Sequence, residues 1–463
     1  PCARSHGISV FSFKQFIVIG GLYMPRPVFL GVTLFVVHSF GGTLHAQTAS
    51  APGAFPSGTD QQAIQAEGEV VEIQSLIEEL ARNNPEIRAA RYRYEAATKR
   101  PSYVGSLPDP KIGVVNFGVG HPLSTLKTSN FAYWGVGISQ EVPFPGKLAL
   151  ASEEAQKEAD SDGEMYRQTV LDNIAQLKVA YYDWFYISKA IEITQKNADL
   201  LERFERIARA RYAVGRGIQQ DILKAQVERS ELAQSLEILL QKRASIQAKI
   251  HALLNRSSEI DLGHPGEVKR SSFNLELDQL QQLIERNSPG LRAQQLMVDG
   301  RAVGIERAKK EYRPDFNFNF QWQKTSSLDP DYYMATAEIK VPLYFWRKQR
   351  YGLEEANARS QESRQSYQAT RQSLLFKAKD QFLIARTSER LLALYESGII
   401  PQATVSLDSA VAGYQVGSVD FLTLIDGLTT LLNFEMQYYE ELVKHEQALA
   451  GLEPIVAIPL TQP

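Results

Sequence analysis

One segment alternates an aromatic side chain with an amide at every step: Phe316-Asn317-Phe318-Asn319-Phe320-Gln321-Trp322-Gln323. Successive side chains of an extended strand point to opposite faces, so this pattern predicts a strand with one aromatic face and one amide face. Such a stripe is common on the core face of a β-sandwich. It also suits a strand that meets lipid on one side and water on the other.

Three further segments show similar alternation, and the four strands are expected near residues 111–119, 131–141, 315–323 and 332–341. Strands of about 9 to 11 residues are long enough to cross a bilayer at a tilt. Four strands cannot close a barrel, and lipid tolerates no open sheet edge, so transmembrane strands would have to be pooled between chains. Two chains would give eight strands with a filled interior, whereas three would give twelve strands and begin to leave a lumen.

The chain also contains an internal repeat of about 200 residues. Three landmarks recur in the same order with offsets of 204, 199 and 202 residues, and chance matches would not keep so constant a spacing. They are Asn84-Pro85 with Ser288-Pro289, Val142-Pro143 with Val341-Pro342, and Tyr212-Ala213-Val214-Gly215 with Tyr414-Gln415-Val416-Gly417. We expect a first repeat over residues 70–265, a second over 266–453, and a C-terminal tail at 454–463.

Each strand pair lies between helical segments. A helix is expected before it, at 86–99 and 290–311, closed by Pro101 and Pro314. A very long helix follows it, at 147–213 and 347–413, with Pro401 as the one proline inside these two stretches. About 67 helical residues would run about 100 Å, which suits either a solvated coiled coil or the wall of a water-filled duct. A shorter helix returns after each Tyr-x-x-Gly, at 219–254 and 421–449.

The N-terminus predicts export. Met24 opens a short basic start, residues 28–37 are almost entirely apolar, and Leu44-His45-Ala46 precedes Gln47. This order is typical of a secretory signal peptide, and the apolar run is too short to span a bilayer. Residues 1–46 are therefore expected to be upstream residues and signal peptide, with Met24 as the start. Residues 47–69, rich in small and polar residues, are expected to form a flexible leader.

Composition excludes several function classes. The 463 residues contain one cysteine, Cys2, so no disulfide framework, zinc finger or redox dithiol is available to the body of the protein. The formal charge is −3, and −6 for the 417 residues after position 46, which does not suggest a nucleic-acid binder. Phosphate-loop, zinc-protease and nucleophile-elbow motifs are incomplete or absent, so we predict no enzyme, no catalytic residue, no cofactor and no metal site.

These features together resemble the TolC-like outer-membrane efflux factors, the exit ducts of tripartite export pumps. The resemblance covers residues 70–452 and rests on the duplication, the order of the elements, and Tyr-x-x-Gly followed by an acidic residue. It implies a mainly α fold with a membrane β-barrel, in which a homotrimer pools four strands per chain into a twelve-stranded barrel. A long α-helical barrel would continue through the periplasm. Trp134, Phe316, Phe318, Phe320 and Trp322 would face outer-membrane lipid.

In this family the tips of the return hairpins close the periplasmic aperture, so the resemblance implies a gate at the tips. Tyr414 stands at the tip tyrosine, Asp221 at an expected acidic position, and Asp426 at a position that lines the constriction. We expect Tyr414 to hydrogen-bond with Asp221 in the closed state, and three copies of Asp426 to form an acidic ring. In the alternative, Tyr414 only packs at a helix end and Asp426 is a solvated charge.

Two tip positions depart from the family pattern. Thr423 stands where a second lining acid can occur, and Val419 stands where a basic latch residue can occur, so the gate is expected to be weaker or organised through Asp420. The implied partners are a periplasmic adaptor and an inner-membrane pump of the RND type. The expected adaptor-docking residues are Gly215, Arg216, Gly217, Gly417, Ser418 and Val419.

The cargo is less well defined by the sequence. Leu107-Pro108-Asp109-Pro110 and residues 139–147 resemble the heavy-metal branch of the family, although prolines at these places also simply shape strand-to-helix junctions. The alternative function is a periplasmic or surface coiled-coil scaffold without a pore. Lipid-facing aromatic residues distinguish the two, because they make the protein depend on detergent.

Overall fold

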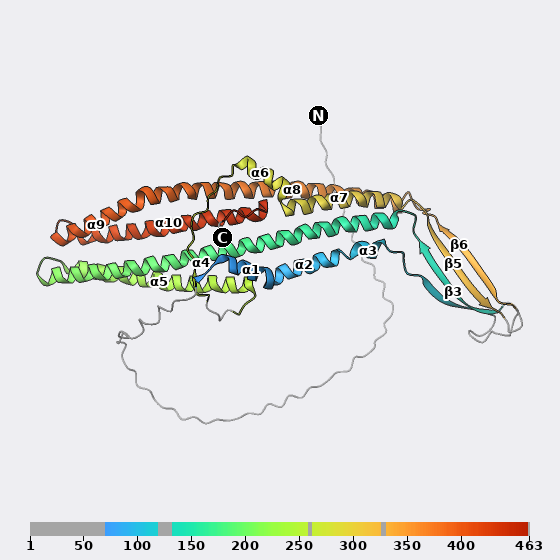
Figure 1. The fold of residues 1–463 in the computed structure, drawn as a ribbon, viewed down its shortest axis with the longest axis horizontal. Helices are drawn as coiled ribbons and strands as arrows, with labels where there is room; N and C mark the ends of the chain where they lie inside the picture. Colours follow the sequence, from blue (N-terminus) through green and yellow to red (C-terminus); the bar gives the residue numbers. More distant parts are fainter. Residues whose placement is uncertain (1–69, 119–131, 258–261, 326–329, 462–463) are drawn as a thin grey trace, which may run out of the picture. The chain divides into compact units, whose positions relative to one another are not determined.

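The computed structural model describes residues 70–118, 132–257, 262–325 and 330–461 (Figure 1). The longer helices are α4 (Lys147–Ala213), α5 (Gln219–Leu254), α7 (Pro289–Lys310), α8 (Lys348–Leu394), α9 (Ile400–Val416) and α10 (Phe421–Val456). The shorter helices are α1 (Ile73–Asn83), α2 (Pro85–Ala97), α3 (Arg100–Gly105) and α6 (Leu277–Asn287). Within the described ranges, no helix combines the length and the apolar character that a membrane crossing requires.

Four strands form one antiparallel sheet in the order β2-β3-β5-β6. They are β2 (Lys111–Phe117), β3 (Tyr133–Val142), β5 (Asp315–Lys324) and β6 (Tyr332–Lys340), close to the four expected segments. The central pairing joins the two repeats, because β3 belongs to the first and β5 to the second. In its register Ile138 lies opposite Phe320, and Val136 opposite Trp322. Both outer strands, β2 and β6, keep one unpaired edge within the described chain.

The register separates the sheet into an apolar face and a mostly polar face. On the polar face the side chain of Asn317 accepts from Ser139 (3.0 Å), and Glu338 accepts from Asn317 (3.1 Å) and Asn319 (3.0 Å). The strict alternation of β5 therefore produces the two chemically different faces that the sequence predicts. The apolar face carries Ile112, Val114, Trp134, Val136, Ile138, Phe316, Phe318, Phe320, Trp322, Tyr333 and Ile339.

The largest apolar cluster surrounds the middle of α4. The side chain of Trp184 is fully buried there, among residues of α1, α5 and α10 such as Leu80, Leu254 and Leu442. Beside this cluster two short strands, β1 (Val70–Val71) and β4 (His264–Pro265), pair in parallel. Tyr181 of α4 donates to the carbonyl oxygen of Val71 (2.9 Å) and accepts from the N–H of Gly266 (2.8 Å). The chain segments that open the two repeats are thus both fixed to α4.

The second long helix is interrupted, which differs from the expected continuous stretch over 347–413. A π-helical segment, η1 (Tyr395–Ile399), separates α8 from α9. Pro401 lies in the first turn of α9. In a regular α-helix a proline cannot donate a hydrogen bond to the carbonyl four residues earlier, and its ring crowds that carbonyl. A π-turn just before the proline relieves this crowding without ending the helix.

The helix expected over 86–99 ends at Ala97, before Pro101, but Pro101 and Pro454 both lie inside helices. Pro101 lies in the first turn of α3, where a missing N–H costs little, so the chain turns into a further short helix. Pro454 lies inside α10, which runs on to Val456. Residues 454–456 are buried against α6 and α8, and this packing outweighs the lost backbone hydrogen bond. The expected C-terminal tail at 454–463 therefore begins with helix.

Candidate channel gate at the helical hairpin tips

The two repeats end their long helices with the same turn. In the first, the N–H of Gly215 donates to the carbonyl of Tyr212 (3.0 Å), and Arg216 N–H to Arg211 (2.9 Å). In the second, Gly417 donates to Tyr414 (3.1 Å) in the same way, and the next residue donates to Gly413. Gly215 and Gly417 have φ values of +72° and +87°, a conformation that glycine adopts without strain. Each Tyr-x-x-Gly is therefore the tip of a helical hairpin.

The tip tyrosines of the two repeats have different environments. Tyr212 is 49% exposed, whereas Tyr414 is 3% exposed within a cluster that includes Phe204 of α4 and Phe421 of α10. The hydroxyl of Tyr414 donates to Oδ2 of Asp221 on α5 at 3.2 Å. The hydrogen bond expected from the sequence is therefore present, and it joins the second hairpin to the first. Burial and the neighbouring Asp221 carboxylate raise the pKa of Tyr414 to about 12.

Arg211 also contacts Tyr414, and this contact was not predicted from the sequence. Its guanidinium lies 4.6 Å from the centroid of the Tyr414 ring, donates to the Tyr414 backbone carbonyl, and donates to the carbonyl of Arg216 at 3.3 Å. A Cβ at Gly417 would lie 3.2 Å from the same guanidinium, so a side chain there would crowd it. The family pattern places a basic latch residue at the position of Val419, on the second hairpin. In this chain the cation is Arg211, which lies on the first hairpin directly before Tyr212.

The other predicted gate residues do not join this contact. Asp420 is the N-cap of α10 and accepts from the N–H of Thr423 at 2.7 Å. Hydrogen bonding from the side chain of Thr423, and secondly from its backbone N–H, lowers the pKa of Asp420. This capping role explains an acid at that position without a latch. Asp426 is exposed on α10 and forms no ion pair with the described residues. A ring of Asp426 side chains would need neighbouring copies of the chain.

A charged network braces the first hairpin behind its tip. Glu205 of α4 is buried and contacts Arg209 (2.6 Å), Arg229 of α5 (3.3 Å) and Gln226 of α5 (3.1 Å). Burial alone would raise the pKa of Glu205, but the hydrogen bonds from Arg209 and Gln226 and the charges of both arginines outweigh it and lower this pKa. The network ties α4 to α5 where the tip contacts begin.

The predicted docking and lipid-facing residues lie in two different parts of the fold. At the tips, Gly215, Arg216, Gly417 and Ser418 are exposed, with Gly217 and Val419 half-buried. On the sheet, Trp134 and Trp322 pack edge to face at 5.4 Å, and Phe318 and Phe320 are 51% and 49% exposed. A large exposed apolar face on a sheet needs a covering partner, either protein or lipid.

The family model for outer membrane efflux proteins matches residues 76–256 and 280–456, one copy in each repeat. The chain belongs to this family. Outer membrane efflux proteins are channels of tripartite efflux systems, with a barrel in the outer membrane and a helical barrel in the periplasm. They are trimeric and act with other efflux pump components, and they are not enzymes. This assignment favours a channel over a coiled-coil scaffold without a pore.

Three proteins that are similar to this chain have low sequence identity to it. The cobalt-zinc-cadmium resistance protein CzcC of Cupriavidus metallidurans is 23% identical over 287 residues, which are 61% of this chain and 67% of that protein. CusC has a TM-score of 0.73 at 14% identity, over 86% of this chain and 95% of CusC. VceC from Vibrio cholerae has a TM-score of 0.72 at 16% identity, over 83% of this chain and 95% of VceC. These structural matches show a shared fold.

Candidate metal sites are absent from the described part of the chain, where no three His, Cys, Asp or Glu side chains gather into a possible ligand set. Of the histidines after position 46, His251 and His445 are buried in helix packing, His264 belongs to β4, and His121 lies outside the described residues.

Proposed function

We propose that this outer membrane efflux protein is a gated exit duct that opens and closes at its hairpin tips. It works as a homotrimer with a periplasmic adaptor, which docks on the exposed tip residues, and with an RND-type pump in the inner membrane. The observation that carries the gate is the contact of Tyr414 with both Asp221 and Arg211. Because Tyr414 lies on the second hairpin and both of its partners lie on the first, these contacts have to break when the hairpins separate.

In the proposed closed state the second hairpin is held at three points. The Tyr414 hydroxyl is held by Asp221, its ring by the Arg211 guanidinium, and its backbone carbonyl by the same guanidinium. A hydrogen bond to a charged group contributes about 1.5 to 3 kcal/mol, so each contact is weak enough to break during transport. An adaptor that binds the separated tips more tightly than the closed tips would shift this equilibrium toward the open duct.

We further propose that three Asp426 side chains, one from each protomer, line the constriction. Three carboxylates around a narrow passage attract cations. In planar bilayers, Asp426→Ala is therefore expected to reduce both the preference for cations and the block by multivalent cations. Asp408→Ala, which removes an acid from α9, serves as the matched control. Unchanged selectivity in Asp426→Ala would contradict the ring.

For the cargo we propose heavy-metal cations. The support is the match to CzcC, whose name states cobalt, zinc and cadmium resistance, together with the Pro-Asp-Pro segment before β2. A duct does not need to bind its cargo tightly, so the lack of a ligand cluster in the described residues is compatible with this role. Energy for transport would come from the inner-membrane pump.

Gene deletion followed by susceptibility testing examines the cargo directly. We expect the deletion strain to become more sensitive to cobalt, zinc, cadmium, copper or silver salts than to dyes and antibiotics, with sensitivity restored by the intact gene. Sensitivity to dyes and antibiotics alone would contradict the metal cargo while leaving the efflux duct intact.

We also propose that the chain is processed before assembly. Residues 1–46 would be removed with the signal peptide, 47–69 would form a leader, and residues 70–265 and 266–453 would be the two repeats. N-terminal sequencing of the purified outer-membrane protein is expected to begin at Gln47. A sequence beginning before Met24 would contradict the proposed start and cleavage.

A further inference from the structure

A polar contact joins the two repeats at the junction between strands and helices. Lys147 Nζ lies 2.9 Å from Asp315 Oδ1 and 3.4 Å from Glu311 Oε2, and the lysine side chain is 8% exposed. The backbone N–H of Phe144 also donates to Asp315 Oδ1, at 2.9 Å. Lys147 is the first residue of α4, where the positive end of the helix dipole disfavours a cation. The two carboxylates compensate for that position and connect the end of β3 to the start of β5.

Both members of this pair have counterparts in the other repeat. Lys348 is the first residue of α8, as Lys147 is the first of α4, and Glu-Glu-Ala begins six residues after each lysine. Asp109 is the acid of a Pro-Asp pair just before β2, as Asp315 is the acid of a Pro-Asp pair at the start of β5. The sequence therefore preserves the same two charges at the same two structural positions.

Within one chain the second pair is separated, because Lys348 follows β6 and Asp109 precedes β2, the opposite edges of the sheet. Both side chains are exposed, and among the described residues neither one has an oppositely charged partner. Lys348 keeps its unfavourable place at a helix N-terminus without the carboxylates that Lys147 has.

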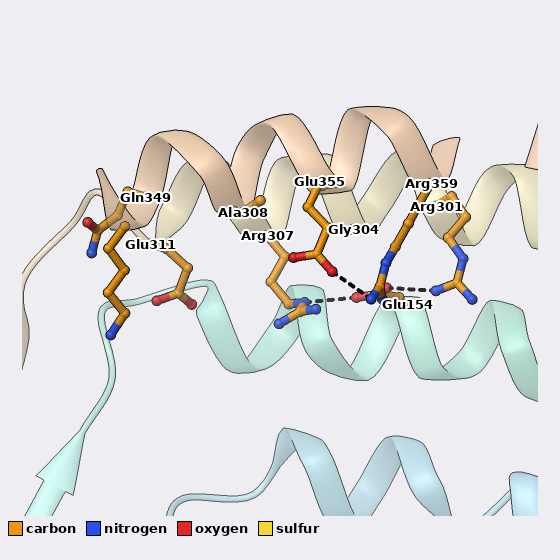
Figure 2. Close-up of a pocket in the computed structure, with 12 residues that line it drawn as sticks. Glu154, Arg301, Gly304, Arg307, Ala308, Glu311, Gln349, Glu355 and Arg359 are labelled. Carbon is orange, nitrogen blue, oxygen red and sulfur yellow. Dashed lines mark hydrogen bonds and ion pairs between the residues drawn. The ribbon is translucent and has the colours of Figure 1, made fainter. Parts of the chain in front are cut away.

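The acids that line the cavity beside Lys348 already have basic partners. Lys348 borders a cavity of about 360 Å³ between α4, α7 and α8, whose charged side chains are drawn in Figure 2. Figure 2 shows that its carboxylates and guanidinium groups pair with one another. The pairs are Glu154 with Arg307 (2.8 Å) and Arg301 (3.6 Å), and Glu355 with Arg359 (2.6 Å), while Glu311 is bound by Lys147.

We propose that Lys348 of one protomer forms an ion pair with Asp109 of the next, which reproduces between subunits the contact that Lys147 and Asp315 make within the chain. The occupant of the open sheet edge is a second copy of this chain, with β6 antiparallel to the neighbouring β2. The inference rests on the trimeric assembly in the proposed function and adds the residues and register of its subunit contact.

The repeat also gives the strand register. In the chain, Ile138 of β3 lies opposite Phe320 of β5. The Val-Pro landmarks map Ile138 onto Ala337, and the Pro-Asp pairs map Phe320 onto Val114. Ala337 of one protomer therefore lies opposite Val114 of the next. Both belong to the apolar face, so the apolar band continues across the subunit boundary, whereas a shift by one residue would turn one strand over.

On the polar face the same register places Lys340 opposite the neighbouring Lys111. Like charges opposite each other are unfavourable on their own. Lys340 already lies 3.5 Å from Glu141 of its own chain, and Asp109 precedes Lys111 by two residues. Carboxylates therefore flank both lysines at this boundary.

Cysteine crosslinking tests the contact, since the sequence has one cysteine, Cys2, in the segment expected to be removed. Asp109→Cys and Lys348→Cys are placed on separate, differently tagged copies that are co-expressed, purified in detergent and treated with a short bis-maleimide. We expect a covalent dimer that carries both tags. The matched control combines Asp315→Cys with Lys348→Cys on separate copies and is expected to give no such dimer.

A charge exchange adds a second readout. Asp109→Lys is expected to lower the temperature at which the trimer dissociates in detergent, and adding Lys348→Asp in the same chain is expected to restore it. One outcome is a trimer that conducts ions while the tagged copies give no crosslink and the double variant does not recover. That result would overturn the contact between Lys348 and Asp109 and leave the channel in place. A chain that stays monomeric in detergent would overturn both the contact and the trimeric duct.

Discussion

Tyr414 and Tyr212 show how one motif acquires two roles after duplication. Both stand three residues before a glycine with positive φ, and both glycines close the same turn. Only Tyr414 is buried, because only its side chain meets an arginine on one neighbouring helix and a carboxylate on another. The Tyr-x-x-Gly motif predicts the turn, but it does not predict which of the two tyrosines packs between the hairpins.

At the residue scale, Tyr414→Phe tests the hydroxyl alone. The change keeps the ring in its apolar cluster and removes the hydrogen bond to Asp221, which contributes about 1.5 to 3 kcal/mol. We expect the closed duct to leak at least about tenfold more, since 1.4 kcal/mol corresponds to a factor of ten. The measurement is entry of a bulky antibiotic into cells that carry the variant. Tyr212→Phe, on the exposed counterpart, is expected to change nothing, and equal leak in both variants would contradict the role of Tyr414.

Arg211 tests the part of the gate that the sequence analysis missed. Arg211→Ala removes the guanidinium that contacts both the ring and the carbonyl of Tyr414, and we expect a larger leak than in Tyr414→Phe. Arg211→Lys keeps the charge but loses the planar group with several donors, so we expect an intermediate leak. Susceptibility to the same antibiotic ranks the variants. A normal barrier in Arg211→Ala would show that the arginine only packs at the helix end.

At the scale of elements, the α4–α5 hairpin depends on a carboxylate with a lowered pKa. Glu205 ordinarily has a pKa of 4.5, and its pKa in the fold is lower, so its ion pairs stabilise the folded state above that pH. The stabilisation is lost as the pH falls below about 4.5 through the lower folded pKa. We expect Glu205→Gln to reduce thermal stability at neutral pH and to flatten the acid dependence, measured by circular dichroism in detergent. An unchanged acid profile would contradict the network.

The strands test the assignment of the two sheet faces. Phe320→Glu places a charge on the apolar face, and charges on a lipid-facing strand cost about 2 to 4 kcal/mol near the bilayer midplane. We expect little trimer in outer-membrane fractions for this variant, measured by quantitative immunoblotting. Gln321→Glu, one position along on the polar face and opposite Gly137 and Met334, is the matched control and is expected to assemble. The opposite result would mean that the faces are exchanged.

The elements also show where sequence patterns stop being informative. The alternation in β5 is strict, so the sequence predicts its two faces. The long proline-free segment over 147–213 likewise predicts both ends of α4. The sequence does not predict the π-helical segment before Pro401 or the continuation of α10 through Pro454, because packing against other elements decides whether a helix continues past a proline. Arg211 was missed because its partner is about 200 residues away and carries no local signal.

At the scale of the whole molecule, one chain builds a fraction of a pore. Its sheet ends in two unpaired strand edges, its apolar face is partly exposed, and Asp426, the proposed lining acid, is exposed and forms no ion pair with the described residues. In the proposed trimer, further copies of the same chain would complete all three features. The internal repeat makes this possible, because contacts between repeats within a chain provide a template for contacts between chains.

Single-channel recording of the purified trimer in planar lipid bilayers tests the gated duct most directly. We predict small, mostly closed conductance steps for the wild type, and larger or longer openings when Arg211→Ala and Tyr414→Phe are combined. Conductance that is absent from both proteins would contradict the channel, and conductance that is the same in both would contradict the gate at Tyr414.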